Sequence, residues 1–238
     1  MTTTEVPPAA HRCDRETTSG YAPELLVWLS PAFPTGSFAY SQGLEGAVDQ
    51  GSVSDEQTLR AWLETLVDAG AIWTDTLFVA LAVRAETDDD AAQLNALALA
   101  LQPSAERYAE TTALGANFRA ALADGWPDAA AACDRLSPDA IAYAVAVGRA
   151  ARAAGATSEM TADAFANASV ANMLSAAIRL SIVGQTGASR IHAAVMPRIA
   201  DAARRAAAMA PSDVASVTVT ADLASMAHET QTVRLFQS

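Results

Sequence analysis

The chain has 238 residues, a formal net charge of −12 and a pI near 4.5; 51% of its residues are hydrophobic but only 6% are aromatic. Nucleic-acid backbones are bound by positively charged surfaces, so this charge excludes nucleic-acid binding as a main role. Much of the apolar content is alanine, the best helix former. The composition therefore predicts an all-α fold, a single-domain helical bundle with no significant sheet.

Residues 1–22 are rich in Thr, Pro and charged residues, which predicts a disordered leader. The leader lacks the apolar run of a secretory signal. The sequence also contains no uninterrupted apolar run of about 20 residues, the length that would predict a membrane span. The two cysteines, Cys13 and Cys133, form no disulfide framework. These features favour a cytoplasmic protein that does not bind membranes.

Helices are expected throughout residues 23–227. They are predicted to cover about 24–29, 37–50, 54–81, 88–101, 104–123, 138–155, 158–184, 187–209 and 212–226, from the spacing of apolar residues and from start and stop signals. Ser54 with Gln57 has the pattern of a capping box, and Gly51 ends the helix before it. Ser137-Pro138 has the pattern of an N-cap followed by proline at the first helical position.

A more specific segment runs from Ser30 to Gly46. Pro31 and Pro34 restrict the backbone, and Gly36 permits a tight turn before a helix start. Aromatic and polar residues then alternate where an amphipathic helix would separate them. The segment is either a proline turn between two core helices or a rigid corner that presents side chains to a partner.

The last residues, 228–238, form a second unusual segment. Val233, Leu235 and Phe236 are apolar, and Arg234 between them carries a planar group with five donors. Terminal segments are usually poorly ordered unless something holds them. We therefore expect 228–238 to be a tail that docks on its own domain or on a partner.

Catalytic patterns are missing from the sequence. The three histidines are His11, His192 and His228, and there is no nucleophile elbow, phosphate-binding loop or dinucleotide-binding loop. Neither His192 nor His228 has a second His or Cys at metal-ligand spacing. We expect a protein that is not an enzyme and that binds no cofactor or metal tightly.

Asn172, Ser175 and Arg179 share one face of the helix expected over 158–184, among apolar residues. One interpretation is a satisfied structural network that fixes the register of a buried helix. Another is a polar, hydrated groove or channel inside the bundle. A helical enzyme with an anion site around Arg179 is a further alternative, although no base lies near this stripe in the sequence.

Three motifs together resemble the family of urease accessory protein F (UreF). They are Ser30-Pro31-x-x-Pro34-x-Gly36-Ser37-Phe38-x-Tyr40-Ser41-Gln42-Gly43-Leu44-Glu45, the stretch 172–180 followed by Val183-Gly184-Gln185-Thr186, and the ending His228-Glu229-Thr230-Gln231 through Arg234-Leu235-Phe236. The chain departs from the family pattern at Thr232 and Val233, where Tyr-Ser is common, and at Gln237, where Arg is frequent.

The resemblance implies a cytoplasmic, dimeric, all-α accessory protein for nickel-dependent urease. It implies a scaffold that joins a second accessory protein (UreD, also called UreH) to the GTPase UreG, so that GTP hydrolysis by the GTPase drives nickel insertion into urease apoprotein. The motif positions expected to bind partners are Gly36, Phe38, Tyr40, Gln185, Arg234 and Phe236. An adaptor for an unrelated GTPase is the alternative from the same class of function.

Overall fold

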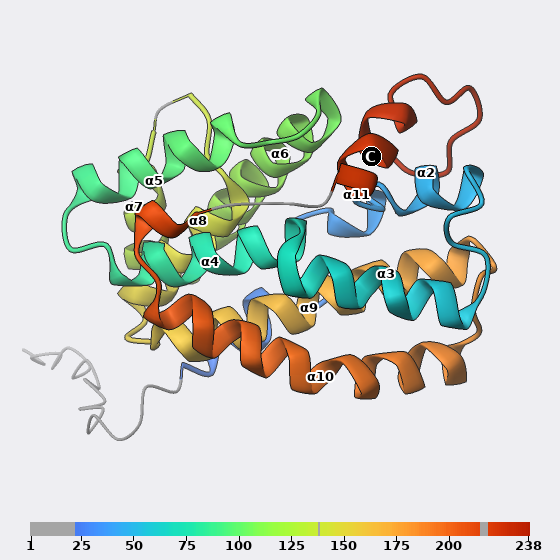
Figure 1. The fold of residues 1–238 in the computed structure, drawn as a ribbon. Coiled ribbons are helices and arrows are strands. Elements are labelled where there is room, and N and C mark those ends of the chain that lie inside the picture. The colour runs from blue at the N-terminus through green and yellow to red at the C-terminus, as the bar shows by residue number, and fades with distance from the viewer. Residues whose placement is uncertain (1–21, 138, 215–218) are drawn as a thin grey trace, which may run out of the picture.

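The computed structural model describes residues 22–137, 139–214 and 219–238. All regular structure in these residues is helical, which confirms the predicted all-α class (Figure 1). The α-helices are α1 Glu24–Trp28, α2 Leu44–Asp49, α3 Glu56–Ala69, α4 Ala71–Arg84, α5 Asp88–Ala100, α6 Ala105–Leu122, α7 Pro127–Asp134, α8 Tyr143–Ala153, α9 Ser158–Arg179, α10 Gln185–Ala208 and α11 Val219–His228. Two 3-10 turns, η1 Ser37–Ala39 and η2 Pro211–Asp213, complete the order.

Helix α4 is the centre of the bundle. Its residues from Thr76 to Val83 are all buried, and α8, α9, α10 and α3 pack around it. A helix that is apolar on every side is expected in such a position. The stretch Glu56–Arg84 is long and apolar enough to span a membrane, but 72% of its most apolar window is buried in the protein. We therefore assign it to the core.

Side-chain caps set the starts of four helices. Asp55, Thr87, Ser104 and Thr157 each accept a hydrogen bond from the backbone N–H three residues later. Such a cap satisfies one of the free donors at a helix start and contributes about 1 kcal/mol. The predicted cap at Ser54 is wrong by one residue, because Asp55 and Thr58 form the capping box.

Other boundaries also differ from the sequence expectation. The helix predicted over 37–50 is interrupted, because Gln42 and Gly43 have φ values of 57° and 81°, which no helix accommodates. The helix predicted over 54–81 is two helices that meet at Gly70. The start predicted at Ser137-Pro138 is wrong, since α8 begins at Tyr143, and Pro138 itself lies outside the described residues. The predicted leader lies outside them apart from Ala22.

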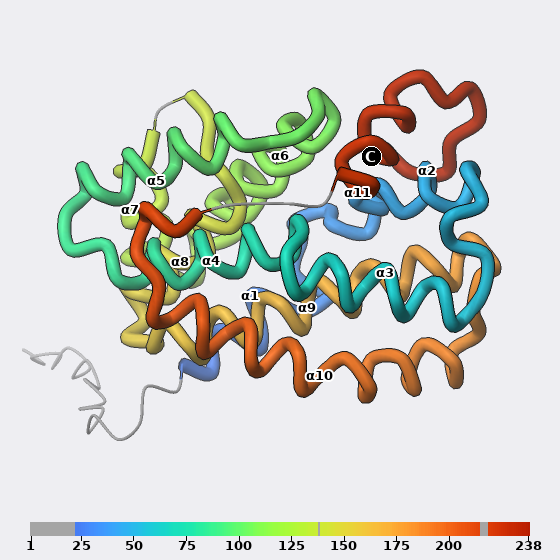
Figure 2. Tube along the Cα trace, viewed as in Figure 1, coloured from blue at the N-terminus to red at the C-terminus, as the bar shows by residue number. Residues whose placement is uncertain are grey.

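Helix α2 and the residues before it meet the C-terminal end of the chain on one side of the bundle. Helix α11 packs against α2, and the chain after α11 runs back over the same region (Figure 2). The contact is close at Gly46, where an added Cβ would lie 2.5 Å from the carbonyl oxygen of Ala224. Glycine at this position is therefore what lets α11 approach α2.

Candidate functional site

Backbone hydrogen bonds join the corner, residues 30–43, to the tail, residues 228–238. The carbonyl of Ser238 accepts from the backbone N–H of Ser41 at 2.7 Å and from its hydroxyl at 2.6 Å. The N–H of Gln237 donates to the carbonyl of Ala39 at 2.9 Å. These bonds connect segments about two hundred residues apart in sequence, so the tail docks on its own domain.

A buried carboxylate holds the middle of the tail. Glu45, only 6% exposed, accepts from the backbone N–H groups of Leu235 and Phe236 at 2.8 and 3.0 Å. Its Oε2 also lies 3.1 Å from Nε2 of His228, whose Nδ1 lies 2.6 Å from Oε2 of Glu106. Hydrogen bonds to a charged acceptor are the stronger kind, so this network fixes the tail to α2 and α6.

Arg234 is engaged by its own chain. Its Nε and Nη2 donate to the carbonyls of Gln231 and Glu229 at 2.7 and 2.6 Å, and its Nη1 pairs with Glu106 at 2.5 Å. The forked group that the sequence suggested for a partner therefore closes the turn of the tail and ties it to α6. Its side chain is still 34% exposed.

Arg179 connects the corner, α9 and the tail. Its guanidinium lies 4.2 Å from the centre of the Phe236 ring and donates a short hydrogen bond to the carbonyl of Phe38. Arg179 is an exposed residue at the end of α9, so it is not part of a buried network on that helix. Asn172, which lies earlier on the same helix, donates to the carbonyl of Tyr40 at 3.4 Å.

The joined segments leave an apolar surface uncovered. Phe38, Val233 and Leu235 are 70%, 81% and 54% exposed, whereas Phe236 is only 4% exposed and packs inward. We call the three exposed side chains, with the adjacent Arg179, the corner–tail surface. Exposed apolar side chains on segments that are held together in this way are candidates for contact with another protein.

The remaining predicted residues have different positions. Gly36 has a φ of 83° at the turn before η1, a conformation that favours glycine. Tyr40 is half-buried, and burial together with the nearby Glu110 raises its pKa. Gln185 is exposed at the first residue of α10 and is not among the residues that join the corner to the tail.

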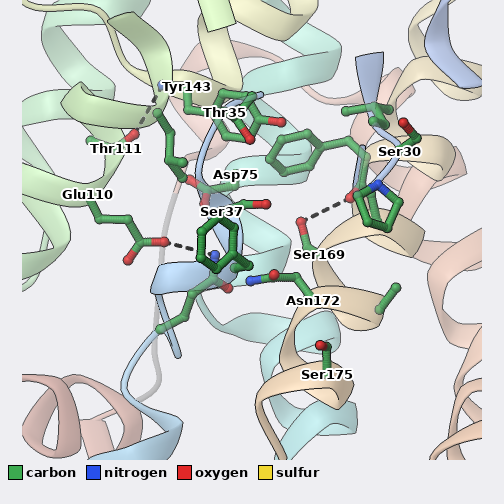
Figure 3. A pocket seen from close by; sticks show the side chains of 18 of the residues that line it. Ser30, Thr35, Ser37, Asp75, Glu110, Thr111, Tyr143, Ser169, Asn172 and Ser175 are labelled. Carbon is green, nitrogen blue, oxygen red and sulfur yellow. Dashed lines mark hydrogen bonds between the residues drawn. The ribbon is translucent and has the colours of Figure 1, made fainter. Parts of the chain in front are cut away.

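A cavity of about 160 Å³ lies beneath the corner, between α4, α6, α8 and α9 (Figure 3). Asn172 and Ser175 of the predicted polar stripe line it, but Arg179 does not. On the opposite wall, Arg107 pairs with Glu110 at 2.5 Å and with Asp75 at 3.5 Å. Burial raises the pKa of Asp75 to about 6, against the opposing effect of Arg107 and with a further increase from Glu110.

Sequence reasoning did not find this group of charges. Arg107 and Glu110 are three residues apart on α6, but Asp75 comes from α4, and only the packing of the two helices brings it near. Glu45 lay inside a recognised motif, yet its pairing with His228 joins positions 183 residues apart. Among the described residues, no group of three or more His, Cys, Asp or Glu side chains could hold a metal ion.

Comparison with known proteins shows the family to which the chain belongs. The family model described as UreF matches residues 53–196. A urease accessory protein UreF of Rhizobium leguminosarum bv. viciae is 46% identical over 215 residues, covering 90% of this chain and 95% of the relative. The corresponding protein of Rhodopseudomonas palustris strain BisB5 is 44% identical over 218 residues, covering 90% of each. With matches across most of its length and the three motifs joined as described, the chain belongs to the UreF family of urease accessory proteins.

Proposed function

We propose that the protein is a scaffold in urease maturation that joins a UreD/UreH-type accessory protein to a UreG-type GTPase and presents both to urease apoprotein. As a member of the UreF family it is an accessory protein and not an enzyme. In this proposal it works in the cytoplasm as a homodimer. Nickel is the cargo of the assembly, GTP is hydrolysed by the GTPase, and this chain binds neither of them tightly.

The corner–tail surface is the observation that supports this proposal. Phe38 is an aromatic side chain that is 70% exposed on a rigid turn, and Val233 and Leu235 lie on a tail held by buried hydrogen bonds. Energetic centres of interfaces are commonly aromatic and arginine side chains on preorganised backbone. A surface of this kind fits protein binding better than it fits catalysis.

Two single substitutions test the proposal. Phe38→Ser and Leu235→Ser should each weaken assembly with the partner proteins by about thirtyfold, the equivalent of about 2 kcal/mol for an interface centre. Because both side chains are exposed, the melting temperature should change little. Pull-down from cells, urease activation and thermal melting are the measurements.

Met196→Ser is the matched control. Met196 is 53% exposed on α10, outside the corner–tail surface, so its replacement removes a similar apolar group elsewhere. Assembly that survives both Phe38→Ser and Leu235→Ser, or that is lost equally with Met196→Ser, contradicts the proposed surface.

A further inference from the structure

The cavity beneath the corner has an uneven balance of charge. The carboxylates of Asp75 and Glu110 share one guanidinium, that of Arg107. Arg107 lies 2.5 Å from Glu110 but 3.5 Å from Asp75, so its charge is used mainly by Glu110. Glu110 also accepts from Ser238 at 2.6 Å and from Gln42 at 3.2 Å. Asp75 is left with one long contact among the described residues.

Asp75 is reachable from the cavity although it lies well below the protein surface. Its side chain is 21% exposed and belongs to the lining of the cavity, whereas that of Glu110 is 1% exposed. A buried carboxylate that shares one guanidinium at 3.5 Å with a second carboxylate is only partly compensated, and pairing with a further cation is the usual way to relieve that cost. The site therefore favours a ligand with a positive charge.

The aromatic and aliphatic residues of the cavity lining favour an organic cation. Trp28, Phe165 and Tyr143 contribute aromatic side chains to the lining of the same cavity, and Leu114 adds an aliphatic side chain. Aromatic rings attract ammonium and guanidinium groups and also pack against an aliphatic stem. The volume of about 160 Å³ is roughly ten times what one water needs, so a side-chain-sized group fits.

The entrance points to a macromolecular source for this group. Pro31, Ser37 and Phe38 of the corner belong to the cavity lining as well, and Phe38 is part of the corner–tail surface. A protein docked on Phe38 would therefore contact a residue that also lines the cavity. The net charge of −12 also favours a basic partner.

We propose that the cavity receives a lysine or arginine side chain of the docked partner, with its charged end against Asp75 and its stem between the aromatic walls. This inference rests on the proposed scaffold function and adds to it a specific anchor point.

The first experiment uses small probes and needs no partner. At equal ionic strength, n-butylguanidinium and n-butylammonium should raise the melting temperature of the full chain and change the tryptophan fluorescence, because Trp28 lines the cavity. The neutral probes n-butanol and butyramide should not, and Asp75→Asn should abolish the response to the cations. A lack of response to both cations, or an equal response to butyramide or to Mg²⁺ alone, would overturn the proposal.

The second experiment measures assembly. Asp75→Asn should weaken binding of the partner proteins at least tenfold, while its melting temperature at neutral pH stays equal to or above that of the wild type. Asp201→Asn, on an exposed part of α10 outside the cavity, makes the same change in net charge and should bind within about twofold of the wild type.

The probe experiment and the assembly experiment distinguish a failure of the scaffold function from a failure of the cavity proposal. If the wild-type chain assembles with no partner, the scaffold function fails, while the probe experiment still tests the cavity. If the wild type assembles and Asp75→Asn assembles equally well, the partner side chain is the wrong source even when the probes bind.

Discussion

The guanidinium of Arg179 lies 4.2 Å from the centre of the Phe236 ring, while one of its nitrogens donates to the carbonyl of Phe38. One exposed cation on α9 thus contacts both segments that form the corner–tail surface. A contact of this kind adds a cation–π interaction and a hydrogen bond, each about 1 kcal/mol.

Arg179→Ala should therefore loosen the tail without unfolding the bundle. We expect the amide of Gln237, which donates to Ala39, to exchange with deuterium roughly tenfold faster, the effect of a loss of about 1.4 kcal/mol in local stability. Arg190→Ala is the control, since Arg190 is an exposed arginine paired with Glu56 on another part of the molecule. Unchanged exchange at Gln237 would show that the tail does not depend on Arg179.

Glu45→Ala should have a larger effect. The substitution leaves the N–H groups of Leu235 and Phe236, and His228, without their buried acceptor, so we expect a loss of about 3–5 kcal/mol in chemical denaturation. Asp49→Ala on the exposed end of the same helix should remain within about 0.5 kcal/mol. A loss below about 1 kcal/mol for Glu45→Ala would mean that the network adds little to stability.

The contributions of the charge and of the forked shape of the Arg234 side chain can be tested separately. Arg234→Lys keeps a cation near Glu106 but loses the fork that bonds the carbonyls of Gln231 and Glu229. If the role of Arg234 is to close the turn of the tail, Lys and Ala should weaken partner binding to a similar extent. Full binding by Arg234→Lys, measured by pull-down or titration, would instead indicate that the charge alone matters.

Gly46→Ala should push α11 away from α2. The new Cβ would lie 2.5 Å from the carbonyl oxygen of Ala224, a backbone atom that can move only with its helix. We expect a loss of about 1–3 kcal/mol in the free energy of unfolding, as for other overpacked positions. Gly125→Ala, where nothing lies within 4 Å of the added Cβ, is the control and should be neutral or slightly stabilising.

Asp75 predicts a specific dependence of stability on pH. Its folded-state pKa of about 6 lies above the usual value, so the folded state binds more protons than the unfolded state between about pH 4 and pH 6. The contribution of Asp75 to stability therefore falls as pH rises through this window. Asp75→Asn should be more stable than the wild type above pH 6, by about 3 kcal/mol, and the difference should disappear near pH 4. Thermal melting of both proteins from pH 4 to pH 8 measures this, and a difference independent of pH would contradict it.

Local sequence signals predicted most helices but not how distant segments meet. Ser104 and Thr157 are caps with backbone partners three residues away, so their sequence neighbourhood contains the whole interaction. The break at Gln42 and Gly43 could not be recognised in this way. Gln42 has a positive φ and a hydrogen bond to Glu110 on α6, a contact that only the folded bundle provides.

The same limit applies to the candidate site. Phe38, Arg179 and Phe236 were each selected from a motif, and the structure brings all three together. The motifs could not show that Phe236 faces inward while its neighbour Leu235 faces outward, because both are apolar and the direction depends on the pairing of the tail with Glu45.

Part of the attachment of the tail is made by its backbone. Glu45 binds the N–H groups of Leu235 and Phe236, and the corner binds the N–H of Gln237 and the carbonyl of Ser238. The side chains of Thr232, Val233 and Gln237 are all exposed, and these are the positions where the ending departs from the family pattern. Substitutions there leave the bonds that anchor the tail in place, because those bonds are made by other atoms. Under the proposed function, partner specificity would reside in the exposed side chains and attachment in the backbone bonds and buried groups, so that one can evolve while the other stays constant.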